Sequence, residues 1–171
     1  MCIRDRNNML RRAKTASSII TSSPGFSEWL QHHGLNSAVV ENRPQRTGTP
    51  SFPDRSTIGY FGRIREIEPF KLLFQSVEML PETQRPRIII AGDGTKFKEV
   101  QSLASSHTEL DVNVRDSFNH DDLPEMMSEI SMMYAMYSPE RGNINDGALP
   151  AKMFEAAAHG RPSIVNANTP M

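Results

Sequence analysis

The sequence predicts an α/β protein built on a doubly wound parallel sheet, and three observations favour this class. Short apolar runs alternate with segments of helical apolar spacing along most of the 171 residues. The run "RIIIAG", residues 87–92, is continuously apolar, as expected for a strand that is covered on both faces. A glycine directly follows some of these runs, at the position where the chain would leave a strand. Strand–helix–strand repeats imply parallel strands joined by right-handed crossovers.

The first 42 residues contain only a strand, a helix and a strand, which are too few to form a domain. The opening letters "MCIRDR" look like a translated adapter sequence, and we interpret 1–14 as such a scar or as a disordered basic start. Ser23 is a plausible N-cap for the helix, with Pro24 at its first position and Gly34 as its end. The expected elements are a strand at 17–21, a helix at 23–34 and a strand at 37–41. We therefore expect 15–42 to be the tail of a preceding domain.

A segment rich in proline, glycine and polar residues, 43–55, is longer than most loops inside a domain and predicts an interdomain linker. Strand and helix patterns alternate again after it, through residues 56–171. The expected strands are 57–62, 87–92, 110–115, 132–137 and 162–167, and the expected helices are 68–80, 95–106, 120–130 and 150–160. The last strand has no helix after it, so we expect this second domain to be truncated.

The composition bears on the partners and the compartment that we expect. A net charge of −1 gives no electrostatic reason to expect nucleic acid as a partner. Cys2 is the single cysteine, so no internal disulfide can form, and a reducing, cytoplasmic setting fits. No apolar run approaches the about 20 residues that a membrane-spanning helix needs.

Ligands of doubly wound sheets bind outside the carboxyl ends of the strands, so the residues there are the candidates for a site. Gly62 and Arg63 follow one strand, and the guanidinium of Arg63 suits a phosphate or remains a solvated surface group. The backbone of 147–149 precedes a helix and offers N–H groups to an anion such as a diphosphate. Within that helix, Glu155 can accept hydrogen bonds from ribose hydroxyls and Lys152 can add positive charge. The plainer interpretation is a carboxylate near a helix N-terminus and an exposed lysine.

A second interpretation uses the turn "GDGTKF", which carries two glycines of a dinucleotide fingerprint. Gly92 and Gly94 would approach a pyrophosphate, and Asp116 would hold a ribose. Phe97 stands where the fingerprint has its third glycine, which weakens this interpretation. The alternative is that the two glycines only make a tight turn.

The spacing of potential ligand residues predicts no metal site. His120, Asp121 and Asp122 are adjacent, whereas ligands on one helix face need three- or four-residue spacing. We interpret this segment as a helix cap. The chain has no D-x-D motif, so a site for a metal-bound nucleotide has no support either.

Several segments together resemble the glycosyl transferases group 1 family of GT-B fold. "PAKMFEAAAHGRPSIV" is similar to its pattern P-x-K-x-x-E-A-x-A-x-G-x-P-x-I. "IGYFGRIR", "RIIIAGDG" and "DVNVRDSFNHDDLPEMMSEI" resemble successive strands and turns of its nucleotide domain, in the same order. "SSIITSSPGFSEWL" resembles the end of its acceptor domain. The resemblance extends over nearly the whole chain after the first residues.

The resemblance implies transfer of a sugar from a UDP- or GDP-linked donor, without a metal or another cofactor, as in polysaccharide biosynthesis. By position, Glu155 matches the ribose-binding glutamate, Arg63 the arginine at the donor phosphates, and Phe118 the place of the nucleobase contacts. The donor-binding residues expected in this way are Gly62, Arg63, Phe118, Gly147, Ala148, Leu149, Lys152 and Glu155. No catalytic residue is assigned. A longer parent protein could also associate with a membrane.

Two positions depart from the family pattern. Many members carry a further glutamate where this chain has Gly147, and a lysine usually stands near the place of Glu68. These departures concern the catalytic details. Two alternatives to a glycosyltransferase also stay open at this point. One is an NAD- or FAD-binding oxidoreductase that uses Gly92, Gly94 and Asp116, and the other is a non-enzymatic α/β binding module.

Overall fold

The computed structural model describes residues 3–46, 51–138 and 147–169, and the chain divides into two compact units. The smaller unit comprises Met1–Asn42, Pro139–Leu149 and Ala167–Met171, and the larger comprises Arg43–Ser138 and Pro150–Asn166. The segment that the composition marks as a linker, 43–55, is thus grouped with the larger unit.

In the smaller unit, a strand–helix–strand segment forms as the sequence predicts. Its strands β1 (Ile20–Thr21) and β2 (Ala38–Val39) pair in parallel, and α2 (Pro24–His32) connects them. The Ser23 side chain accepts a hydrogen bond from the Phe26 N–H at 3.3 Å, which confirms the predicted N-cap.

The basic start of the chain differs from its expectation. Residues Ile3–Ala13 form helix α1, with Arg11 and Arg12 in its last turn. This stretch contains neither proline nor glycine, and four of its residues are arginine, a good helix former. Cations in the last turn also complement the helix dipole. Local propensity therefore favours a helix in a segment that the sequence analysis interpreted as a scar or as disordered.

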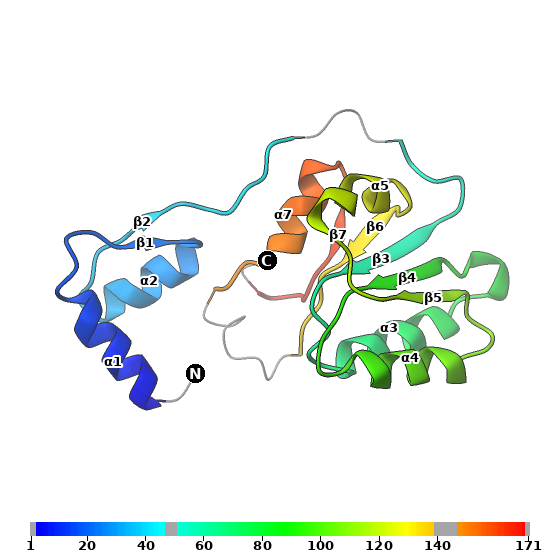
Figure 1. The fold of residues 1–171 in the computed structure, drawn as a ribbon, viewed down its shortest axis with the longest axis horizontal. Helices are drawn as coiled ribbons and strands as arrows, with labels where there is room; N and C mark the ends of the chain where they lie inside the picture. The colour runs from blue at the N-terminus through cyan, green and yellow to red at the C-terminus, as the bar shows by residue number, and fades with distance from the viewer. Residues whose placement is uncertain (1–2, 47–50, 139–146, 170–171) are drawn as a thin grey trace. The chain divides into compact units, whose positions relative to one another are not determined.

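The larger unit is a doubly wound α/β layer structure, which confirms the predicted fold class (Figure 1). Its five parallel strands lie in the order β5-β4-β3-β6-β7. The strands are β3 (Thr57–Phe61), β4 (Arg87–Ala91), β5 (Val112–Arg115), β6 (Met132–Tyr134) and β7 (Ser163–Ile164). The helices are α3 (Glu68–Glu78), η1 (Glu82–Gln84), α4 (Phe97–Ser106), η2 (His120–Asp122), α5 (Leu123–Ser128) and α7 (Ala151–Ala158). The chain winds outward from β3 in one direction and then returns to β6 on its other side.

Helices cover both faces of this sheet, with α3 and α4 on one side and α5 and α7 on the other (Figure 1). The strand β4 is buried on both faces, because Ile88 and Ile90 belong to one core cluster and Ile89 belongs to the other. All three isoleucines are fully buried. Among the described residues, no helix has both the length and the apolar character that crossing a bilayer requires.

A buried arginine fastens the segment before β3 to the end of α7. The Nε of Arg161 donates to the Met127 carbonyl oxygen at 2.8 Å, and its guanidinium also donates to the carbonyl of Ser51. The guanidinium carbon lies 4.4 Å from the ring centroid of Phe52, in the geometry of a cation–π contact. Arg161 is only 4% exposed, so this tie is part of the packed structure.

Candidate functional site

The strand order places a topological switch point between β3 and β6, where connections leave in opposite directions. Loops that follow the carboxyl ends of the strands surround this point, and ligands of such sheets bind there. Gly62 and Arg63 follow β3, and Gly92 to Gly94 follow the adjacent strand β4. These two loops are the first part of the candidate site.

The loops after β3 and β4 are packed backbone to backbone. The Gly62 N–H donates to the Ala91 carbonyl at 3.0 Å, and the Ile64 N–H donates to the Asp93 carbonyl at 2.7 Å. A Cβ atom on Gly92 would lie 1.9 Å from the Gly62 carbonyl oxygen, and one on Gly94 would lie 2.1 Å from that of Ile64. Both glycines have φ +146°, which L-residues with a side chain rarely adopt.

This packing explains Gly92 and Gly94 without a dinucleotide. Asp116, the third residue of that alternative, is exposed, and its Oδ1 accepts from the neighbouring Ser117 N–H at 2.7 Å. No observation in the described residues supports an oxidoreductase site.

Lys152 reaches the end of β3 from the first turn of α7. Its Nζ lies 3.4 Å from the ring centroid of Tyr60 and 5.4 Å from that of Tyr137, both cation–π distances. The same Nζ lies 3.6 Å from the place that a Cβ on Gly62 would occupy. Lys152 is 8% exposed, so it is a buried residue and not the exposed lysine of the plainer interpretation.

Arg63 follows Gly62 directly, but its side chain faces solvent. This side chain is 64% exposed, and its Nε lies 3.7 Å from Asp93 Oδ1. The Tyr60 hydroxyl donates to the Arg63 carbonyl oxygen at 2.7 Å, so one tyrosine fixes the Arg63 backbone and also contacts Lys152. Exposed ion pairs of this length are weak, and Arg63 can exchange Asp93 for another anion at little cost.

Glu155 lies in the second turn of α7, because the helix begins at Ala151 with Pro150 as its N-cap residue. It is partly buried, and the three-residue spacing places it on the same helix face as Lys152. The pair that stood out in the sequence therefore lies on one face of α7.

Phe118 follows β5 and is partly buried against the core cluster beneath α5 and α7. Its ring centroid lies 6.1 Å from that of Phe61 in an edge-on arrangement. Three residues earlier, Arg115 makes a two-pronged pair with Glu129, with both N–O distances 2.6 Å. This pairing raises the pKa of Arg115 and lowers that of Glu129, since each hydrogen bond favours the charged forms.

Gly147, Ala148 and Leu149 belong to the smaller unit. Gly147 has φ +88°, and a Cβ there would lie 2.5 Å from the Cα of Gly25, in the first turn of α2. The geometry of the larger unit thus brings together Gly62, Arg63 and Lys152. That the backbone of 147–149 takes part in donor binding stays a prediction.

The segment around His120 forms a helix cap, as interpreted from the sequence. The Asn119 N–H donates to Asp122 Oδ2 at 3.1 Å in a capping box before α5. A different set of residues, far apart in the sequence, does converge: Glu78, His107 and Glu109. Spacing along one helix could not reveal it.

Sequence reasoning missed the aromatic support of the site. Tyr60 is the penultimate residue of β3, a position from which a long side chain reaches the loop edge, and this is the signal that could have identified it. Glu66 was also missed, and its Oε2 accepts from the Ser138 N–H at 3.1 Å, linking the loops after β3 and β6.

Comparison with solved structures finds similar folds among glycosyltransferases. A complex of S. aureus TarM with Fondaparinux, alpha-GlcNAc-glycerol and UDP has a TM-score of 0.75 at 12% identity, over 95% of this chain and 32% of that one. Anabaena HepE in complex with UDP and glucose has a TM-score of 0.74 at 15% identity, over 96% and 48%. The lipopolysaccharide outer core galactosyltransferase WaaB has a TM-score of 0.66 at 19% identity, over 88% and 43%. The chain spans between a third and a half of the length of these proteins.

Comparison with curated protein sequences finds no match. The family model described as "Glycosyl transferases group 1" matches residues 55–170, which is more than half of the chain. This range contains the whole sheet of the larger unit and every donor-binding residue that the sequence motifs single out, from Gly62 to Glu155. The chain belongs to the glycosyl transferases group 1 family.

Proposed function

We propose that the larger unit binds the nucleoside diphosphate part of a UDP- or GDP-linked sugar, as the donor half of a glycosyltransferase. The observation that carries the proposal is the position of Lys152, whose Nζ lies beside Gly62 at the switch point of the sheet. Two of the similar solved structures are complexes with UDP, which supports a nucleotide of this type.

The chemistry of the residues fits a diphosphate better than a neutral ligand. The ammonium of Lys152 stays close to the rings of Tyr60 and Tyr137, and such contacts are worth about 2 kcal/mol when desolvated. A diphosphate would add full negative charges next to this ammonium and to the guanidinium of Arg63. Glu155, on the face of Lys152, would accept hydrogen bonds from the ribose hydroxyls, and Phe118 would contact the base.

The proposal includes transfer without a catalytic metal in the donor site. The two cations Arg63 and Lys152 would neutralise the leaving diphosphate, a task that a bound metal performs in other enzymes. It also includes a cytoplasmic setting, a role in polysaccharide synthesis and an acceptor whose identity we leave open.

Binding of UDP to a charge-free variant tests the proposal. Lys152→Met keeps the length and the apolar stem of the side chain but removes its charge. We expect UDP binding to weaken by about 1.5–3 kcal/mol, the range for hydrogen bonds to charged groups, which is roughly ten- to hundredfold in Kd. Isothermal titration with UDP, GDP and NAD measures the effect and the preference.

Lys71→Met is the matched control, because Lys71 is exposed on α3 and its Nζ pairs with Glu68 Oε1 at 3.1 Å. It should bind UDP like the unchanged chain. Equal affinities of the two variants for UDP would remove Lys152 from the site. Binding of NAD in preference to both nucleoside diphosphates would contradict the proposed function.

A further inference from the structure

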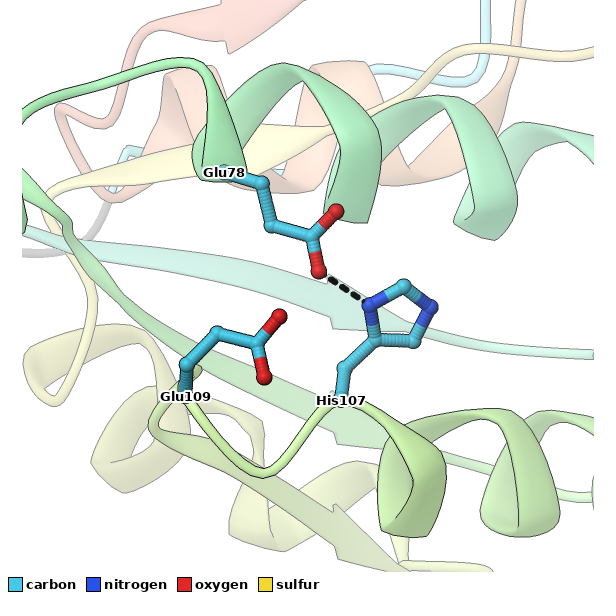
Figure 2. A group of neighbouring side chains, drawn as sticks. All are labelled: Glu78, His107 and Glu109. Carbon is cyan, nitrogen blue, oxygen red and sulfur yellow. Dashed lines mark hydrogen bonds and ion pairs between the residues drawn. The ribbon is translucent and has the colours of Figure 1, made fainter.

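Three side chains with metal-binding groups converge at the edge of the sheet where β4 and β5 begin (Figure 2). Glu78 is the last residue of α3, His107 follows the last residue of α4, and Glu109 lies in the turn that leads into β5. One ligand atom from each residue lies within 4.8 Å of the other two. The strands end at the opposite edge, so this cluster is separate from the candidate nucleotide site.

The histidine is held in place by the core of the larger unit. Its Nδ1 is paired with Glu78 Oε1, and its ring lies edge-on to that of Phe74, with centroids 5.3 Å apart. Phe74 is fully buried, and the side chains of His107 and Glu78 are only 22% and 27% exposed. The imidazole therefore has a fixed orientation before any ligand binds.

A short turn brings the third ligand to the same place. The Leu110 N–H donates to the His107 carbonyl oxygen at 3.1 Å, and Leu110 is itself buried. Glu109 lies inside this turn. Figure 2 shows its carboxylate and that of Glu78 on the same side of the His107 ring. The turn therefore adds a second carboxylate to the pair of Glu78 and His107.

We propose that Glu78, His107 and Glu109 bind a divalent cation of the zinc class. Imidazole with carboxylates suits zinc, whereas magnesium and calcium prefer oxygen ligands alone. Tetrahedral zinc with bonds of about 2.0 Å places its ligand atoms about 3.3 Å apart. Glu109 is exposed, so its side chain can rotate toward this spacing.

The ion would join the end of α3 to the end of α4 and to the start of β5. With the three ligands found among the described residues, one tetrahedral position would remain for a water molecule. Such an ion stabilises the larger unit and takes no part in donor binding. The proposal therefore stands or falls separately from the proposed function.

Metal titration of the full chain tests the site. Cys2→Ser serves as the background, because Cys2 is the only thiol in the sequence and thiolates also bind zinc. We expect one equivalent of Zn²⁺ to bind in isothermal titration and to raise the Tm, because a ligand of the native state stabilises it by mass action. Co²⁺ in its place should give visible absorption bands that report its ligands.

His107→Ala should weaken Zn²⁺ binding by roughly tenfold or more, since even residues that only orient a metal ligand contribute 10–100-fold. Glu109→Gln should weaken it similarly and leaves the Glu78–His107 pair intact, which keeps the test decisive if His107→Ala does not fold. His120→Ala is the matched control, because this histidine is exposed and is followed by two aspartates.

Three results would overturn the site. One is the lack of stoichiometric Zn²⁺ binding to the folded chain. Another is unchanged Zn²⁺ affinity in Glu109→Gln, which would leave only an ion pair between Glu78 and His107. The third is a loss of binding in His120→Ala, which would place the metal at the cap of α5. Binding of UDP should be the same with and without Zn²⁺.

Discussion

The edge of the larger sheet where the strands end and the edge where they begin are built from different groups. At the first edge, backbone atoms of two glycine loops are packed together, and Lys152 and Arg63 are nearby. At the second edge, side chains from two helix ends meet, and two of the three are carboxylates. In our proposals, an anion binds at the first edge and a cation at the second, and loops and helix ends rather than strands supply the groups that bind them.

The largest effect is expected from a substitution in the glycine loops. Gly92→Ala would place a Cβ 1.9 Å from the Gly62 carbonyl oxygen and impose a φ that alanine avoids. Backbone strain and overpacking each cost about 1–3 kcal/mol, so we expect the free energy of unfolding to fall by about 4 kcal/mol. Urea denaturation measures it.

Gly34→Ala separates strain from collision. Gly34 has φ +73°, and no atom lies within 4 Å of the position that a Cβ would take, so only the left-handed backbone is penalised, by about 1–2 kcal/mol. Equal losses for Gly92→Ala and Gly34→Ala would show that the two loops are not packed as described.

The next effect concerns the nucleotide alone. Glu155→Ala should weaken UDP or GDP binding by about 1.5–3 kcal/mol, because it removes the proposed acceptor for the ribose hydroxyls. Glu125→Ala, an exposed glutamate of α5, should leave the Kd unchanged in the same titration. Unchanged affinity in a folded Glu155→Ala variant would exclude this residue from the site.

A smaller effect is expected at the ion pair between Arg115, the last residue of β5, and Glu129. Arg115→Met should lower the free energy of unfolding at pH 7 by about 1 kcal/mol, a value suited to a partly exposed pair. The hydrogen bond from Arg115 lowers the pKa of Glu129 below its usual value of 4.5. The stabilisation is therefore fully present above that value and is lost as pH falls through the lowered pKa.

Urea denaturation of the unchanged chain and of Arg115→Met between pH 7 and pH 3 measures this change. Their free energies of unfolding should become equal near pH 3. Lys96→Met, which breaks the exposed pair with Glu99, should cost less at pH 7. A cost for Arg115→Met that stays constant down to pH 3 would contradict an ionic origin.

The smallest effect is expected from removal of metal. EDTA should leave the Kd for UDP unchanged, because Arg63 and Lys152 supply the positive charge in the proposed site. The same treatment should lower the Tm if the second edge holds zinc. Loss of UDP binding in EDTA would contradict the proposal that the nucleotide binds without a metal.

Much of the fold could be predicted because the strands are covered on both faces. The continuous run of β4 and the proline and glycine near element ends indicated the alternation of strands and helices. Helix α1 was not predicted, because the adapter-like residues at the start of the chain led us to interpret this segment as a scar or as disordered. Short strands such as β7 (Ser163–Ile164) were predicted too long, because the apolar pattern continues past the last ladder pair.

The candidate site was predictable only where one helix carries its residues. Lys152 and Glu155 share α7, so their spacing revealed a common face. The burial of Lys152 depends on Tyr60, which lies on a strand far earlier in the chain, and no local pattern contains that contact. Likewise, Glu78 and His107 meet only because the ends of α3 and α4 lie together.

The tie made by Arg161 has a consequence for how far the preceding chain can reach. An extended residue spans about 3.3–3.6 Å, so the six residues 51–56 would contribute roughly 20 Å of free length if the chain left the larger unit at β3. Because Arg161 holds the Ser51 carbonyl and the Phe52 ring, this length of chain stays against the larger unit instead. Arg161 thus removes roughly 20 Å of free length from the chain before β3, and a shorter linker raises the effective concentration of the groups that it joins.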